Sequence, residues 1–155
     1  MDEGVAMPRF EVVERIDIAA PAEKVWGYRL DYTTLPDYNP NVTGLERVDG
    51  GAELGVGAVY RFQVDMGAGP VDSTLRVREA VPHSRIVNDI EGPGASATET
   101  ITVRHVQGGA QLEFVMSAQV PDGLDGQTMA AMEAGGRAQI VLELENIKAA
   151  LEGTG

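Results

Sequence analysis

The sequence predicts an α+β fold in which a curved antiparallel sheet is covered by one long helix. Two observations carry this prediction. Between residues 42 and 120, apolar and polar residues alternate in short runs that Gly and Pro separate, which is typical of consecutive antiparallel strands. After Pro121, apolar residues recur every three or four positions, as they do on one face of a helix. Only that helix is long enough to cover the apolar face of the sheet.

Length and composition agree with one globular domain. The chain has 155 residues, of which 43% are hydrophobic and 23% are charged, and a typical domain has roughly 150 residues. We expect a single domain over residues 8–153. Residues 1–7 are expected to be a flexible extension, because Met7 could itself begin the sequence. This acidic segment lacks the basic and apolar regions of a secretory signal, so a cytoplasmic location is expected.

Charge and residue usage exclude several classes of function. Twelve basic and 24 acidic residues give a formal charge of −12, which disfavours nucleic acids and anionic membranes as partners. No apolar run approaches the roughly 20 residues of a membrane-spanning helix, so no membrane insertion is expected. Cysteine is absent, and His83 and His105 stand alone without a second ligand at a metal-binding spacing. We therefore expect neither a metal nor an organic cofactor.

The elements follow in a simple order along the chain. Residues 10–18 alternate as one strand, and Pro21 then marks the first turn of a short helix. Pro36 and Pro40 allow only a broken or single-turn helix between residues 31 and 40. Six strands are expected at 42–48, 58–66, 71–80, 85–91, 96–106 and 111–120. The long helix begins at Asp125 or Gln127 and ends at Gly153.

Several short motifs in this order resemble the START-like, or SRPBCC, superfamily, in its polyketide cyclase and dehydrase branch. They are Ala20-Pro21, Val25-Trp26, Asp31 and Leu35-Pro36-Asp37-Tyr38. The resemblance implies a helix-grip fold: six to seven strands wrap around the long C-terminal helix, and two short helices follow the first strand. It also implies a largely apolar cavity between sheet and helix. Fold alone does not define a reaction.

Strand parity predicts which polar residues face that cavity. Glu14, Asn88, Glu99 and His105 fall on the inward faces of their strands. Burial raises the pKa of a carboxyl group, so Glu14 and Glu99 are candidate acids or bases, and His105 is a candidate proton shuttle. Each also has a structural interpretation: the carboxyls can pair with neighbours, His105 can be a solvated residue at a strand end, and Asn88 can satisfy a backbone group.

The remaining candidates bind ligand through apolar or aromatic contacts. The resemblance implies that Trp26 and Tyr32 line the pocket, with Tyr38 a less clear match, and Tyr32 is also a candidate proton carrier; packing in the core is the alternative for these aromatics. Gly135 and Gly136 weaken the helix and indicate that space is needed there. By parity and helical spacing, the other wall residues are Tyr60, Phe62, Ile101, Phe114, Met116, Met132, Gly136 and Ile140.

One departure from the related cyclases concerns arginine. The resemblance implies an arginine inside the pocket, yet all five strand arginines fall on the outer face by parity: Arg61, Arg76, Arg78, Arg85 and Arg104. Arg137 lies on the long helix, four residues after Glu133, and an exposed ion pair between the two side chains is sufficient to explain its presence there.

Two main functions therefore stay open. The first is an enzyme that orients a polyketide-like chain for cyclisation or loss of water, with Glu99, His105, Tyr32 or Glu14 moving protons. The second is a non-catalytic carrier or sensor of a hydrophobic ligand. A protein-interaction module that uses the outer face of the sheet is a third, but the charged and hydroxyl groups on that face favour a pocket instead. The chain is expected to be a monomer or a homodimer.

Overall fold

A computed structural model describes residues 9–65, 67, 69–93, 95–120 and 123–153. It confirms the predicted α+β class and the helix-grip arrangement. The expected N-terminal extension and Met66, at the end of an expected strand, lie outside the described residues. The elements are β1 (Arg9–Ile18), α1 (Ala22–Leu30), a single 3₁₀ turn η1 (Tyr32–Thr34), α2 (Leu35–Tyr38), β2 (Val42–Arg47), β3 (Val59–Asp65), β4 (Pro70–Val81), β5 (Arg85–Gly92), β6 (Ala95–Val106), β7 (Gly109–Gln119) and α3 (Gly126–Glu152).

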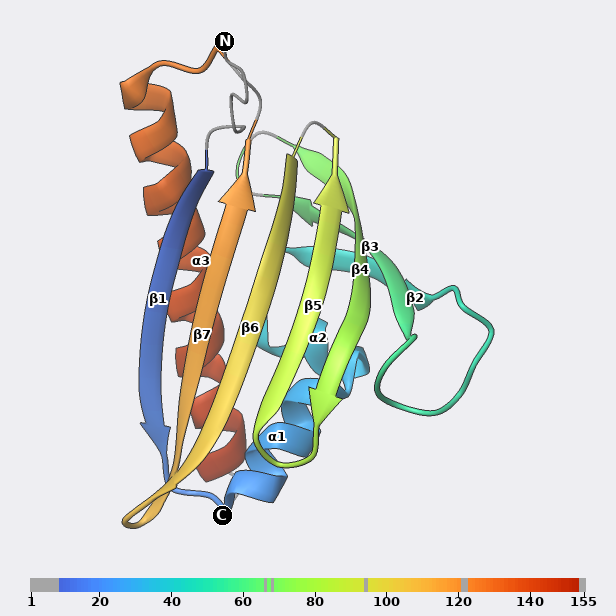
Figure 1. The fold of residues 1–155 in the computed structure, drawn as a ribbon, viewed down its shortest axis with the longest axis vertical. Coiled ribbons are helices and arrows are strands. Elements are labelled where there is room, and N and C mark those ends of the chain that lie inside the picture. The colour runs from blue at the N-terminus through green and yellow to red at the C-terminus, as the bar shows by residue number, and fades with distance from the viewer. Residues whose placement is uncertain (1–8, 66, 68, 94, 121–122, 154–155) are drawn as a thin grey trace, which may run out of the picture.

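The seven strands form one antiparallel sheet in the order β1-β7-β6-β5-β4-β3-β2. Strands that are neighbours in the sequence pair with each other from β2 to β7, as expected for a series of hairpins. The exception is β1, which pairs with β7 over its whole length. In Figure 1 the sheet curves, with α3 along one face and α1 and α2 beside the lower part of that face.

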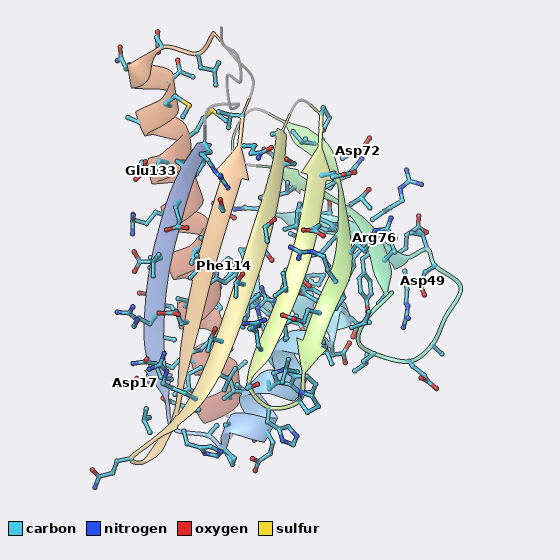
Figure 2. The ribbon with its side chains drawn as sticks, viewed as in Figure 1. Asp17, Asp49, Asp72, Arg76, Phe114 and Glu133 are labelled. Atoms are coloured by element: carbon cyan, nitrogen blue, oxygen red, sulfur yellow. The ribbon has the colours of Figure 1, made fainter. Side chains whose placement is uncertain are left out.

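The two faces of the sheet differ as strand parity predicts. Val12, Leu75, Ile86, Ile101 and Leu112 are buried on the side that carries the helices. The five strand arginines predicted to point outward, Arg61, Arg76, Arg78, Arg85 and Arg104, are all exposed, which confirms their predicted direction. Figure 2 shows Phe114 near the centre of the sheet, whereas Asp17, Asp49 and Asp72 lie toward its margins. The register shift in β4 reverses its parity locally: Leu75 and Val77 are buried before the shift, whereas Ala80, opposite Ile86, packs against the core after it.

The long helix α3 is buried unevenly along its length. Its first turn is capped by Asp125, whose carboxylate accepts a hydrogen bond from the Thr128 backbone N–H at 2.6 Å. Asp125 is therefore the cap, and the helix begins one residue later. The fully buried residues of α3 all belong to its second half, from Ile140 to Leu151. The first half of α3, by contrast, has no fully buried residue among those described. None of the helices in the described part of the chain is long and apolar enough to cross a membrane.

Candidate functional site

A cavity of about 620 Å³ lies between the first half of α3 and the concave face of the sheet. This volume is within the range of ordinary small-molecule sites. Its apolar wall comes from β1, β2, β3, β4, β5, β7, α2 and α3. The main apolar residues of the wall are Phe10, Leu35, Val42, Phe62, Val64, Leu75, Ile90, Phe114, Met116, Ala118, Met132 and Ile140.

Glycines in α3 shape this cavity. Gly135 and Gly136 both line it, within a helix that continues unbroken from Gly126 to Glu152. A Cβ atom at Gly136 would lie only 2.9 Å from the Cε atom of Met116, so a side chain here would displace Met116. The two glycines therefore leave room beside Met132, at a cost in helix propensity of about 1 kcal/mol each.

One end of the cavity holds a buried cluster of charged groups. Arg29, from the last turn of α1, is only 1% exposed. Its Nη2 atom lies 3.7 Å from Glu99 Oε1 on β6 and 3.9 Å from Glu143 Oε1 on α3. The guanidinium carbon also lies 5.1 Å from the ring centre of Tyr32 and 5.4 Å from those of Tyr38 and Phe114, within range of cation–π attraction.

Two asparagines hold the carboxylates of this cluster in place. Asn39, which follows α2, donates from Nδ2 to Glu143 Oε2 at 2.7 Å. Asn88 on β5 is completely buried; its Nδ2 donates to Glu99 Oε1 at 3.4 Å and makes a short contact with the Tyr32 hydroxyl. The η1 turn that carries Tyr32 is fixed by Asp31, whose carboxylate accepts from the Thr33 backbone N–H. Helices, turn and strands therefore meet at one cluster.

Burial controls the protonation of these groups. It raises the pKa of Glu99 to about 7, and the neighbouring Glu143 carboxylate adds to the rise while Arg29 opposes it. Burial also raises the pKa of Glu143, against the opposing effects of Arg29 and Asn39. It raises the pKa of Tyr32 and Tyr38 as well, so both phenols stay neutral hydroxyl groups. Near neutral pH, Glu99 can therefore either give or take a proton.

Several polar atoms around the cluster lack a hydrogen-bond partner among the described residues. A buried polar group without a partner is uncommon and is often satisfied by water or a ligand. The unpartnered atoms include both donors and acceptors: Arg29 Nε and Nη1, Tyr38 Oη, Asn88 Oδ1, Gln139 Oε1 and Glu143 Oε1.

The structure brings many of the predicted site residues together. Nine of them line the cavity or touch its charged end: Tyr32, Phe62, Asn88, Glu99, Phe114, Met116, Met132, Gly136 and Ile140. Tyr38, Tyr60 and Ile101 are buried but do not line the cavity. Tyr38 lies against Arg29, and Tyr60 packs on Tyr32 with 5.5 Å between ring centres. These three are core residues that support the wall.

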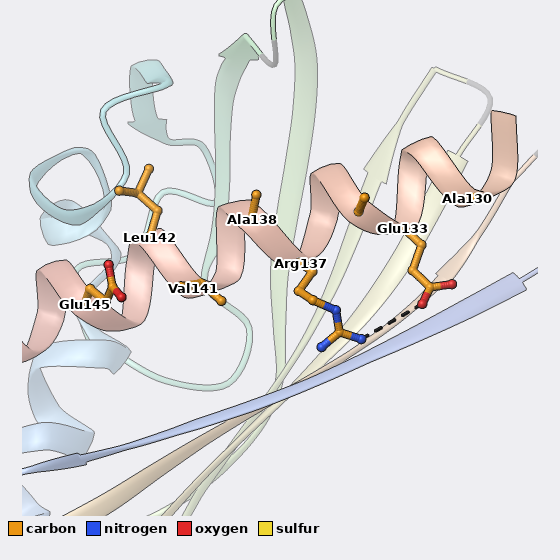
Figure 3. Close-up of a pocket in the computed structure, with 8 residues that line it drawn as sticks. Ala130, Glu133, Arg137, Ala138, Val141, Leu142 and Glu145 are labelled. Carbon is orange, nitrogen blue, oxygen red and sulfur yellow. Dashed lines mark ion pairs between the residues drawn. The ribbon is translucent and has the colours of Figure 1, made fainter. Parts of the chain in front are cut away.

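Two predicted proton carriers lie away from the cavity. Glu14 does face α3, but β1 is an edge strand, so its side chain meets the flank of the helix and pairs with Arg137. Arg137 also approaches Glu133 at 3.9 Å, beside a shallow outer hollow of α3 (Figure 3). His105 is exposed near the β6–β7 turn, which agrees with its alternative interpretation as a solvated residue at a strand end.

Trp26 also lies outside the cavity. Val25 and Arg29 are four residues apart on the buried face of α1, so the adjacent Trp26 points to a different side. Its indole N–H donates to the Arg85 carbonyl at 3.2 Å, and its ring meets His83 edge-on at 5.6 Å. Trp26 therefore packs α1 against the β4–β5 turn.

Arg29, Asn39, Gln139 and Glu143 were not predicted from the sequence. Strand parity applies only to strand arginines, whereas helical spacing from Val25 could have identified Arg29. The same rule applies to α3, because Gln139 and Glu143 follow Met132 and Gly136 by seven residues each. No comparable signal marks Asn39, which lies in a connection between α2 and β2.

Comparisons with known proteins agree with this architecture. Residues 9–152 match the model of a family described as polyketide cyclase / dehydrase and lipid transport. None of the curated proteins matches the chain.

Solved structures resemble it at low sequence identity and so inform the fold alone. The Zhui aromatase/cyclase from Streptomyces sp. R1128 has a TM-score of 0.74 at 17% identity, with 93% of this chain and 94% of that chain covered. A START superfamily protein from Mycobacterium smegmatis has a TM-score of 0.72 at 16% identity, with 91% and 98% covered. The di-domain aromatase/cyclase StfQ of the steffimycin biosynthetic pathway has a TM-score of 0.74 at 13% identity, with 92% of this chain and 50% of that chain covered.

Proposed function

The chain belongs to the polyketide cyclase / dehydrase and lipid-transport family of the START-like superfamily, and from this premise we propose that it binds a hydrophobic small molecule and assists its cyclisation or dehydration. The observation that carries the proposal is an apolar cavity that ends on the buried Arg29, Glu99 and Glu143. The apolar wall would hold the body of the molecule, and the charged cluster would face its reacting end.

The cluster has the groups that loss of water requires. In such a step one acid protonates a leaving hydroxyl, while one base removes a proton from the carbon next to a carbonyl; a carbon–carbon double bond forms and water departs. Glu99, with its pKa near 7, would act as the acid, and Glu143 held by Asn39 would act as the base. Arg29 would attract the carbonyl oxygen as negative charge develops on it. Restricting the chain within the cavity would supply further acceleration.

Native mass spectrometry of the purified protein would test binding first, by identifying any small molecule that remains bound. Turnover of the identified molecule, or of a synthetic β-hydroxy ketone with an aromatic body, would then be followed by chromatography. We expect Glu99→Gln to lower kcat at least about 100-fold, since acid–base catalysis contributes roughly that much or more. Glu133→Gln is the matched control, because Glu133 lies outside the cavity and is half-exposed.

A carrier function is the alternative, and the separation of polar and apolar parts of the cavity favours it. The charged groups Arg29, Glu99 and Glu143 gather at one end, an arrangement that would anchor an unreactive ligand by its head. A carrier would release its bound molecule chemically unchanged, and Glu99→Gln would alter only the affinity. Recovery of unaltered ligand after long incubation, together with absence of turnover for every hydroxy ketone offered, would contradict the enzymatic proposal.

A further inference from the structure

The charge balance at the charged end of the cavity indicates which kind of ligand it binds, and this inference rests on the proposed function. Arg29 is the only cationic side chain among the described residues that line the cavity. It faces two carboxyl groups, Glu99 at 3.7 Å and Glu143 at 3.9 Å. The cluster therefore carries one net negative charge when both carboxyls are ionised, and none when one of them holds a proton.

We propose that the cavity selects an uncharged ligand whose polar end carries a hydroxyl group, alone or beside a carbonyl, and that it rejects ligands with a carboxylate head. A carboxylate would place a third negative charge around one guanidinium that two glutamates already balance. Like charges repel strongly where water is excluded, and Arg29, Glu99 and Glu143 are all buried. A neutral head avoids this repulsion.

The hydrogen-bonding capacity of the same end of the cavity also favours a ligand that carries a hydroxyl group. Arg29 has unpartnered N–H donors, whereas Glu143 Oε1 and Gln139 Oε1 are unpartnered acceptors among the described residues. A hydroxyl group can accept from the guanidinium and donate to one of these oxygens, while a carboxylate can only accept. Gln139 lies one helical turn before Glu143, and both line the cavity. The structure thus assigns Gln139 to the recognition of the ligand head.

Matched aromatic probes test this selection. The full chain would be titrated at pH 8 with 2-naphthol, 2-naphthoate and 2-methylnaphthalene, which share one ring system and differ in the head, and affinities would be measured by calorimetry. We expect 2-naphthol to bind at least about tenfold more tightly than 2-naphthoate, because repulsion of a like charge costs at least this much. 2-Methylnaphthalene should compete with 2-naphthol, which would show that both bind at the same site.

Removing the acidic charges should reverse the preference. In the double variant Glu99→Gln/Glu143→Gln, Arg29 loses both balancing carboxylates, so 2-naphthoate should bind more tightly than 2-naphthol. If this variant does not fold, Glu143→Gln alone serves, since a glutamine oxygen can still accept from Asn39; the naphthol preference should then fall by about threefold or more. Glu133→Gln, on the outer side of α3, should keep the wild-type preference.

The outcomes separate this inference from the proposed function. If 2-naphthoate binds the wild type as tightly as 2-naphthol and competes with 2-methylnaphthalene, the inference is overturned while a small-molecule cavity stands. An unchanged preference in Glu143→Gln would overturn it as well. If no probe binds, both the inference and the proposed function fail.

Discussion

At the scale of single residues, the environment of Glu99 gives the protein a specific response to pH. Its pKa is near 7 in the folded protein and near 4.5 as an ordinary glutamate. Between these pH values the folded state holds a proton that the unfolded state has released. The contribution of Glu99 to stability is therefore complete below pH 4.5 and is lost as the pH rises to 7.

Glu99→Gln should remove this dependence, because glutamine does not ionise. The free energy of unfolding of the variant, relative to wild type, should rise between pH 4.5 and 7 by up to about 3 kcal/mol and level off above pH 7. Urea unfolding of both proteins across this range measures the difference, and the effects of acidic residues away from the cluster cancel. A constant difference would show that Glu99 is not perturbed by burial.

Arg29→Met should be strongly destabilising, because it leaves two buried carboxylates without their cation. At pH 8 we expect a loss of about 3 kcal/mol or more in the free energy of unfolding. The loss should be smaller at pH 5, which is below the pKa of Glu99, and burial also raises the pKa of Glu143. Chemical unfolding at the two pH values tests this, and Arg76→Met on the exposed face of β4 provides the control. Equal losses at both pH values would contradict the charge explanation.

Individual residues also show what the sequence could and could not predict. Strand parity identified Glu99 and Asn88 because a regular strand alternates its faces. It also identified Glu14 as inward, which is true, but parity contains no information on which part of α3 an edge strand meets. The distances from Arg29 to Glu99 and Glu143 depend on how α1, β6 and α3 pack together, and this packing is not encoded in any local pattern.

At the scale of elements, α3 has two halves with different tasks. Its second half packs Ile140, Leu144 and Ile147 into the core, whereas its first half borders the cavity with Met132 and Gly136. The spacing of apolar residues predicted the whole helix, because that spacing persists through both halves. It did not distinguish core from cavity; only the adjacent glycines indicated a local need for space.

Gly136→Ala should weaken ligand binding while it stabilises the helix α3. Alanine favours a helix by about 1 kcal/mol over glycine, but its Cβ would displace the flexible end of Met116, which also lines the cavity. We expect an unfolding free energy equal to or above that of wild type and several-fold weaker binding of 2-naphthol. Thermal unfolding and calorimetry measure the two quantities. Binding that stays at the wild-type level would show that the space at Gly136 is not used by the ligand.

At the scale of the whole molecule, the formal charge of −12 is spread over a small protein. Repulsion between surface carboxylates opposes folding, and salt screens it. Raising sodium chloride from about 20 to 200 mM should therefore increase the melting temperature, because the Debye length falls below about 10 Å near 0.1 M. Differential scanning calorimetry tests this, with a neutral osmolyte as the control. A decrease with salt would show that the ion pairs outweigh the repulsion.

The pairing of β1 with β7 has a consequence for how this protein is made. On the ribosome, Arg9 emerges long before its partner Gln119, so the first strand has no neighbour to join while more than a hundred residues are added. Closure of so large a loop is slow compared with the formation of the intervening hairpins. Nascent chains in which β6 has left the ribosome but β7 has not should therefore hold β2 to β6 as a growing sheet, while Val12 and Ile18 stay accessible to chaperones.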